Sequence, residues 1–185
     1  MVNRPQNQEG IAVNKTTGLI AATGFIATVW IANWLISHYG VVPVGFGLVA
    51  PAGVYAVGVA FTLRDITHRA LGPWAVIGAI VIGAGLSWLI APAFAVASGV
   101  AFLVSETADL AVYTPLRRKS WIGSVAVSNT VGLAVDSALF LWLAFGSLTF
   151  FWGQVVGKAW MTLAAVALMA AFRGARGLLP GNAPA

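Results

Sequence analysis

The chain has 185 residues, of which 59% are hydrophobic and only 8% are charged. A soluble domain carries about 25% charged residues, so this composition excludes an ordinary soluble enzyme and a disordered protein alike. The ten Lys and Arg residues outnumber the five acids. They are too few for a nucleic-acid-binding protein and instead suit the basic loops that orient a membrane protein. There is no cysteine, which excludes disulfides and cysteine-based chemistry.

The apolar runs predict six membrane-spanning helices, because each span needs about 20 residues. Residues 1–17 are polar and are expected to form a disordered cytoplasmic tail. The stretch 38–50 is apolar but rich in Gly and Pro, which favours an outer loop against the bundle or a broken helix end. The spans are predicted at 18–37, 52–70, 73–90, 93–113, 121–145 and 149–172, with a second cytoplasmic tail at 173–185. The predicted fold class is therefore an all-α, multi-pass membrane protein with one transmembrane domain at 18–172.

The basic residues are expected at one face of the membrane. With six spans, nine of the ten fall on the same side: Arg4, Lys15, Arg64, Arg69, Arg117, Arg118, Lys119, Arg173 and Arg176. Cytoplasmic loops carry an excess of Lys and Arg, so both termini are predicted in the cytoplasm. A span count wrong by one would scatter these charges over both sides, so the asymmetry favours six.

Five charged residues fall inside predicted spans: Asp65, Glu106, Asp109, Asp136 and Lys158. Charge in a membrane costs at least a few kcal/mol and usually faces a cavity or a partner. Lys158 and Asp136 both lie about 14 Å from the outer ends of their helices. They are predicted to pair, either as a structural ion pair or within a binding site. For Asp65, a salt bridge with Arg69 at the cytoplasmic rim is the alternative to a binding role.

The fourth and fifth spans each carry polar residues on one face. Glu106 and Asp109 are spaced i, i+3, and Tyr113 extends their face. Two acids on one face within lipid require a cationic, protonated or donor-rich partner, so we interpret them as binding or proton-carrying groups. Asn129 and Asp136 share a face of the fifth span, where Asn129 could equally hold helices together.

Motifs of catalysis are absent from the sequence. There is no His-Glu-x-x-His helix, no Gly-x-Ser-x-Gly elbow and no phosphate-binding loop. His38 and His68 are expected at opposite membrane faces, where they could not share a metal ion. We therefore predict a protein that is not an enzyme and has no metal site or cofactor.

Four parts of the chain have a recognisable order and spacing: FTLRDITHRALG at 61–72, SETADLAVY at 105–113 with Leu116-Arg117 after it, SNTVGLAVDS at 128–137, and Lys158. They resemble parts of the queuosine precursor transporter family, also called the VUT or putative vitamin uptake transporter family. The first resembles the Thr-Asp-x-x-x-(Glu/Arg)-x-x-Gly end of its second helix. The others resemble its fourth-helix Gln-x-x-Asp stretch and basic loop, its fifth-helix Asp-Ser/Thr signature and the lone lysine of its last helix.

The resemblance implies uptake, across the cell (inner or plasma) membrane, of 7-cyano-7-deazaguanine or its aminomethyl form, by secondary transport or facilitated diffusion. The candidate substrate-binding residues are Asp65, Glu106, Asp109, Tyr113, Asn129, Asp136 and Lys158. A carboxylate accepts the N1–H and the exocyclic amine of a guanine-like edge together. Asn129 or Lys158 could donate to the ring carbonyl, and Tyr113 could stack on the ring.

Two positions in this region differ from the family pattern. Glu106 stands where the family commonly has Gln, and Arg64 stands where it has Thr before Asp65. The additional acid is compatible with a more cationic substrate, such as the aminomethyl form, or with proton coupling.

A different class of protein has a similar size and span count. The substrate-binding S-component of an energy-coupling-factor vitamin transporter also has six spans in about this length, and it depends on a separate ATPase. Small residues on the first span, such as Gly24, Thr28 and Ala32, could dock such a partner or simply pack against neighbouring helices. The sequence leaves this alternative open, as it leaves the oligomeric state, including a homo-oligomer.

Overall fold

The structure, a computed structural model, describes residues 14–116 and 121–177. Most of the two predicted tails lies outside these residues, as do Arg4, Arg117, Arg118 and Lys119. The elements are α1 (Lys15–Tyr39), β1 (Val41–Gly45), β2 (Leu48–Pro51), α2 (Val54–Leu71), α3 (Pro73–Trp88), α4 (Pro92–Leu116), α5 (Trp121–Phe145) and α6 (Phe151–Gly177). The predicted all-α class is confirmed, with six helices in the described residues.

Local sequence accounts for the helix ends. The side chain of Asn14 accepts a hydrogen bond from the Thr16 amide, so α1 begins at Lys15 rather than at 18. Gly72 has a φ of +85° and ends α2, and Pro73 starts α3 in its first turn, as predicted. The last helix continues to Gly177 rather than ending at 172.

The stretch 38–50 contacts α6, as expected of a loop lying against the bundle, but it contains regular structure that was not predicted. Its first residues complete α1, and the rest forms an antiparallel hairpin of β1 and β2, in which Val42 pairs with Ala50. The two-residue turn is Phe46-Gly47, and both residues have positive φ, at +53° and +72°. A tight hairpin turn of this kind matches the twist of its strands, which the sequence alone did not indicate.

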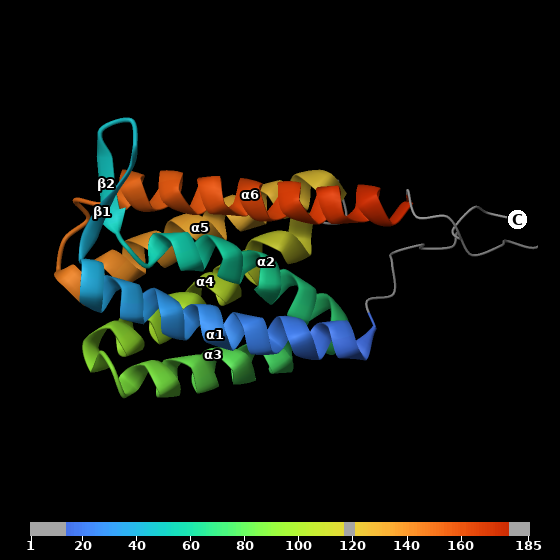
Figure 1. Ribbon diagram of the computed structural model, residues 1–185, viewed down its shortest axis with the longest axis horizontal. Coiled ribbons are helices and arrows are strands. Elements are labelled where there is room, and N and C mark those ends of the chain that lie inside the picture. The colour runs from blue at the N-terminus through green and yellow to red at the C-terminus, as the bar shows by residue number, and fades with distance from the viewer. Residues whose placement is uncertain (1–13, 117–120, 178–185) are drawn as a thin grey trace, which may run out of the picture.

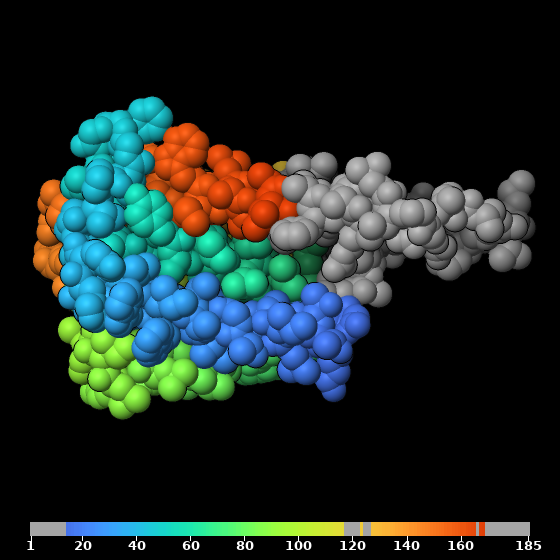
Figure 2. All heavy atoms as spheres, viewed as in Figure 1, coloured from blue at the N-terminus to red at the C-terminus, as the bar shows by residue number. Residues whose placement is uncertain are grey.

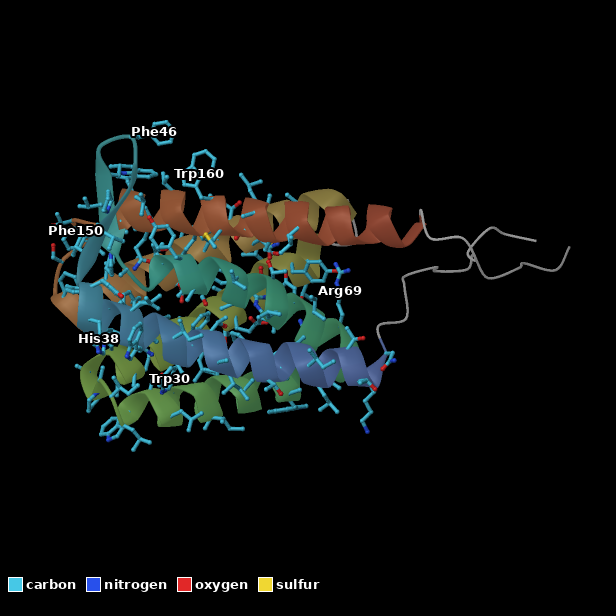
Figure 3. The ribbon with its side chains drawn as sticks, in the orientation of Figure 1. Trp30, His38, Phe46, Arg69, Phe150 and Trp160 are labelled. Atoms are coloured by element: carbon cyan, nitrogen blue, oxygen red, sulfur yellow. The ribbon has the colours of Figure 1, made fainter. Side chains whose placement is uncertain are left out.

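The helices run along the long axis of the molecule, each antiparallel to the next (Figure 1). Lys15 and Gly177, the described ends of the first and last helices, therefore lie at the same end, and the hairpin lies at the opposite end. Figure 2 shows the hairpin projecting beyond the helices there. Figure 3 places Arg69 toward the end that carries the termini, and His38 and Phe150 near the hairpin.

The core is apolar and so is much of the outer surface. Phe25, Val29, Ile80 and Phe102 pack together from α1, α3 and α4. Large apolar side chains are also exposed on the helices, among them Ile20, Val81, Leu89, Trp142 and Leu163. Outward-facing apolar residues on this scale are typical of helices that meet lipid or a partner.

Within residues 14–116 and 121–177, three helices are long and apolar enough to cross a membrane: α1, α4 and the part of α5 at Val127–Phe145. Helix α3 is apolar but shorter. Helix α2 carries Arg64, Asp65 and Arg69 within its 18 residues. These charges, unusual in an apolar bundle, lead to the candidate site.

Candidate functional site

A polar cavity lies at the helix ends farthest from the hairpin. Its volume is about 310 Å³, at the lower end of the range for pockets that hold small molecules. We call it the wide cavity. Helices α2, α4 and α5 line it with Arg64, Asp65, His68, Arg69, Asp109, Leu110, Tyr113, Ser128 and Asn129.

Arg64 is the residue that joins the acids of this region. Its Nη1 lies 3.2 Å from Asp65 Oδ1 on the same helix and 3.1 Å from Glu106 Oε2 on α4. The side chain is buried, with 6% of its residue surface exposed. Glu106 and Asp109 were expected to meet a cationic, protonated or donor-rich partner, and for Glu106 that partner is the cation Arg64. For Asp65, a salt bridge with Arg69 was the alternative to a binding role; among the described ion pairs, Asp65 is joined to Arg64 instead.

Two residues that line the wide cavity each have a polar atom without a hydrogen-bond partner. In the part of the chain that the structure describes, Arg64 Nε and Asp109 Oδ1 are the buried side-chain atoms left unpaired. Each residue is more than nine-tenths buried. One atom is a donor and the other an acceptor, and neither is open to the cavity as the side chains stand. Buried polar groups normally have partners, and exceptions need an explanation.

Gly132 brings α5 close to this acid. A methyl group built at Gly132 would lie 3.4 Å from Asp109 Cβ and 3.7 Å from Asp109 Oδ1. The predicted face of α5 that carries Asn129, Gly132 and Asp136 thus passes from the wide cavity, along Asp109, into the interior.

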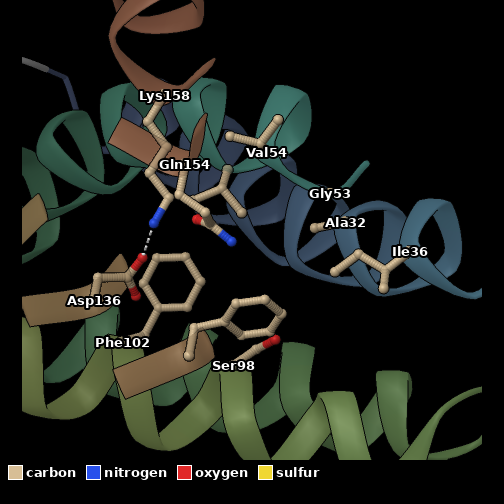
Figure 4. A pocket seen from close by; sticks show the side chains of 11 residues that line it. Ala32, Ile36, Gly53, Val54, Ser98, Phe102, Asp136, Gln154 and Lys158 are labelled. Atoms are coloured by element: carbon tan, nitrogen blue, oxygen red, sulfur yellow. Dashed lines mark hydrogen bonds and ion pairs between the residues drawn. The ribbon is translucent and has the colours of Figure 1, made fainter. Parts of the chain in front are cut away.

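At the interior end of that face lies an ion pair. Lys158 Nζ on α6 donates to Asp136 Oδ2 at 2.5 Å and to Ser137 Oγ at 2.8 Å on α5. Figure 4 shows this contact beside Gln154 and Phe102. The predicted pairing of Asp136 with Lys158 is therefore confirmed. Both residues are buried, with exposed fractions of 3% and 1%.

The ion pair lines a second cavity, which we call the small cavity. Its volume of about 20 Å³ is room for one water molecule. Its other lining residues come mainly from α1, α2 and α4 and include Ala32, Val54, Ser98 and Phe102. The structure is thus open to a small molecule at the wide cavity and closed around Lys158.

A phenylalanine adjoins the cations of both cavities. The ring centre of Phe61 lies 5.6 Å from Arg64 Cζ and 5.9 Å from Lys158 Nζ, within the range of a cation–π contact. The Phe61 ring also meets Phe102 edge-on, with 5.9 Å between centres. These aromatic rings lie where the polar faces of the two cavities approach each other.

The seven residues predicted as a substrate site divide between the two cavities. The wide cavity is lined by four of them, Asp65, Asp109, Tyr113 and Asn129. Glu106 does not line it but forms an ion pair with Arg64, which does. Asp136 and Lys158 line the small cavity. Sequence reasoning had treated Arg64 as a basic residue of the cytoplasmic rim and had not considered His68 or Ser128 as lining residues.

The small cavity also has a polar wall that was not predicted. Gln154 lies one turn before Lys158 on α6, and Ser98 Oγ donates to Asn33 Oδ1 at 2.8 Å between α4 and α1. The signal available was the presence of Asn33 and Gln154 in otherwise apolar runs. Polar side chains in apolar helices are commonly turned toward neighbouring helices.

Comparison with known proteins gives one family match. Residues 88–172 match the model of a family described as putative vitamin uptake transporter. No curated protein and no solved structure matches the chain. The matched segment contains α4, α5 and the part of α6 that bears Lys158. It therefore includes Glu106, Asp109 and Asp136 and the whole of the two helices that carry them. Together with the apolar helices, this match supports a membrane protein that takes up a small molecule. Over these residues, a little under half of the chain, the protein is similar to the putative vitamin uptake transporter family.

Proposed function

We propose that this protein carries a queuosine precursor, 7-cyano-7-deazaguanine or its aminomethyl form, across the cell (inner or plasma) membrane. The observation that carries the proposal is the wide cavity: a space of about 310 Å³ walled by carboxylates and a buried guanidinium within an apolar helical protein. Charged groups inside such a protein usually line a substrate pathway.

The wall of the wide cavity suits a flat, hydrogen-bonding heterocycle. Asp65 and Asp109 are carboxylates that can accept the ring N–H and exocyclic amine of a guanine-like edge. Tyr113 supplies an aromatic face on which such a ring can stack. Asn129 adds an amide that both donates and accepts.

The position of the wide cavity supports a transport role. It lies at the end of the molecule that carries both described helix ends, and Arg69 lies at that end too (Figure 3). We infer six spans with both termini in the cytoplasm, because basic residues favour the cytoplasmic side. The wide cavity then faces the cytoplasm, and the small cavity with Asp136 and Lys158 occupies the closed, outer half of the pathway.

Uptake into liposomes tests the function. The purified chain, reconstituted alone, is expected to accumulate labelled 7-cyano-7-deazaguanine by exchange against unlabelled ligand trapped inside. Asp109→Asn is the binding-site variant and is expected to lower the exchange rate at least about tenfold, since it weakens a charge-assisted hydrogen bond. Trp74→Phe, at an exposed position on α3 that lines neither cavity, is the matched control.

Two results would contradict the proposal. Exchange that requires an added ATPase complex would identify a binding subunit instead of a self-sufficient transporter. Exchange of vitamins but of no deazapurine would retain the transport function and exclude the proposed substrate.

A further inference from the structure

Arg64 has a buried donor left over after its ion pairs are made. Nη1 serves both Asp65 and Glu106, while the buried Nε, on a residue that lines the wide cavity, remains without a partner. A guanidinium holds its donors in a rigid plane, so fixing Nη1 also fixes the direction of Nε. The two carboxylates therefore position Arg64 as a directional donor.

Asp109 offers the complementary acceptor. Its Oδ1 is buried and unpaired, and it lines the same cavity as Arg64. Asp109 is three residues after Glu106 on α4, so both acids lie on the helix face that Arg64 contacts. Because both residues line the cavity, a side-chain rotation at each would present its unpaired atom to a single ligand there.

We propose that Arg64 and Asp109 form a donor–acceptor pair that selects a planar ring presenting a carbonyl oxygen beside a ring N–H. Arg64 Nε donates to the carbonyl, and Asp109 Oδ1 accepts from the N–H. This inference rests on the proposed function and deepens it, because it assigns the ligand's amide edge to two residues and gives Arg64 a role in specificity.

The charge around the cavity restricts the ligand further. Among the described residues at the cavity, the carboxylates of Asp65, Glu106 and Asp109 outnumber the guanidinium groups of Arg64 and Arg69. A ligand that added a negative charge would meet this excess of acids in a partly dry site, where like charges repel strongly. The pair therefore selects neutral or cationic rings with an amide edge, rather than carboxylates or phosphates.

A double variant can remove the donor without stranding the buried Glu106. Arg64→Thr by itself would strand that carboxylate, and breaking a buried ion pair on one side is strongly destabilising. Arg64→Thr with Glu106→Gln removes both of these partners together. Asp65 also loses its contact with Arg64, but its side chain is 45% exposed, so water can solvate it. Asp109→Asn tests the acceptor separately, with its shape retained.

The experiment measures affinity for two ligands. One is 7-cyano-7-deazaguanine, and the other is its analogue with hydrogen in place of the carbonyl oxygen. In the analogue the neighbouring N1 carries no proton, so the carbonyl acceptor and the N–H donor are both lost. Purified full-length protein is expected to prefer the carbonyl ligand about 10- to 100-fold, the range for hydrogen bonds to charged groups. The preference should fall at least about fivefold in the double variant and in Asp109→Asn. It should be unchanged in Trp74→Phe, whose side chain is exposed and lines neither cavity.

The outcomes separate this inference from the proposed function. Wild-type binding with the preference retained in both variants would overturn the donor–acceptor pair while leaving the transporter proposal in place. Wild-type protein that binds no deazaguanine would overturn both. Size-exclusion elution and thermal unfolding show which variants are folded, and either variant alone suffices to decide.

Discussion

Lys158 shows how a charge is accommodated in an apolar interior. Its ammonium group has a carboxylate partner in Asp136, a hydroxyl partner in Ser137 and the ring of Phe61 nearby. Taking two charges out of water is costly, and their attraction offsets that cost only when the remaining donors are also satisfied. The pair is therefore weak evidence for stability, but the loss of one partner is severe.

This reasoning gives a prediction for single and paired substitutions. Lys158→Met alone and Asp136→Asn alone are each expected to lower the free energy of unfolding, with Lys158→Met costing about 3–5 kcal/mol because it strands a buried carboxylate. The double variant should recover most of the loss. Thermal unfolding in detergent measures stability, and liposome exchange measures function in the same samples.

The double variant also distinguishes a structural from a functional pair. A stable double variant with normal exchange would mean that the pair serves packing alone. A stable variant without exchange would place the charges in the transport pathway. Failure of the double variant to recover stability would contradict the account of the pair given above.

A contact between two charged residues could be predicted where both lie at the same depth along their helices. Asp136 and Lys158 lie at similar distances from the outer helix ends, and that alone indicated their pairing. Arg64 was misread, because spacing along α2 shows which residues share a face but not which face meets α4. Its position near the end of the span favoured the rim, whereas the acid on α4 draws it inward.

Among the elements, the β1–β2 hairpin is the one that the sequence concealed. Hairpin turns with positive φ at both central residues are usually formed by Asn-Gly or Gly-Gly, and here the first residue is Phe46. The Phe46 ring stacks on Trp160 of α6, with 6.2 Å between centres and 19° between planes. This contact between distant residues compensates for an unfavourable turn residue, and no local pattern reports it.

The hairpin is seated on α6 through glycines. A methyl group at Gly153 would collide with the backbone oxygen of Val49 in β2, and one at Gly157 would meet Val54 and Val44. The spacing i, i+4 keeps both glycines on one face, a pattern that allows close backbone approach in membranes. Helix α6 thereby brings Gln154 and Lys158 against the start of α2.

Alanine substitutions at two helical glycines test this seat. Gly153→Ala is expected to lower the free energy of unfolding by about 1–3 kcal/mol, because the methyl group is forced against backbone that cannot yield freely. Gly78→Ala in α3 is the matched control: its methyl group would meet no described atom within 4 Å. That substitution should stabilise the protein by about 0.5–1 kcal/mol through the better helix propensity of Ala. Equal effects of the two substitutions in thermal unfolding would contradict the close contact between hairpin and α6.

At the scale of the whole molecule, composition was the most reliable guide. The apolar runs indicated the helical class and most helix positions. Because so few residues are charged, those inside the apolar runs could be singled out, and they line or adjoin the two cavities. The division into a wide and a small cavity did not follow, because cavity size depends on how α2, α4 and α5 diverge. That divergence is a property of tertiary packing, which periodicity within one helix does not report.

The proposed orientation can be tested on the intact protein because the chain has no cysteine of its own. Phe46 at the hairpin tip and Trp74 at the start of α3 lie at opposite ends of the bundle and are about equally exposed, at 80% and 81%. In intact cells, Phe46→Cys is expected to react with a membrane-impermeant maleimide. Trp74→Cys should react only after permeabilisation, because in the proposed orientation its end of the bundle faces the cytoplasm. Because the two sites are about equally exposed, a difference in labelling between the two variants cannot be explained by a buried side chain at one of them. Labelling of Trp74→Cys from outside, with Phe46→Cys protected, would invert the molecule and turn the wide cavity toward the exterior.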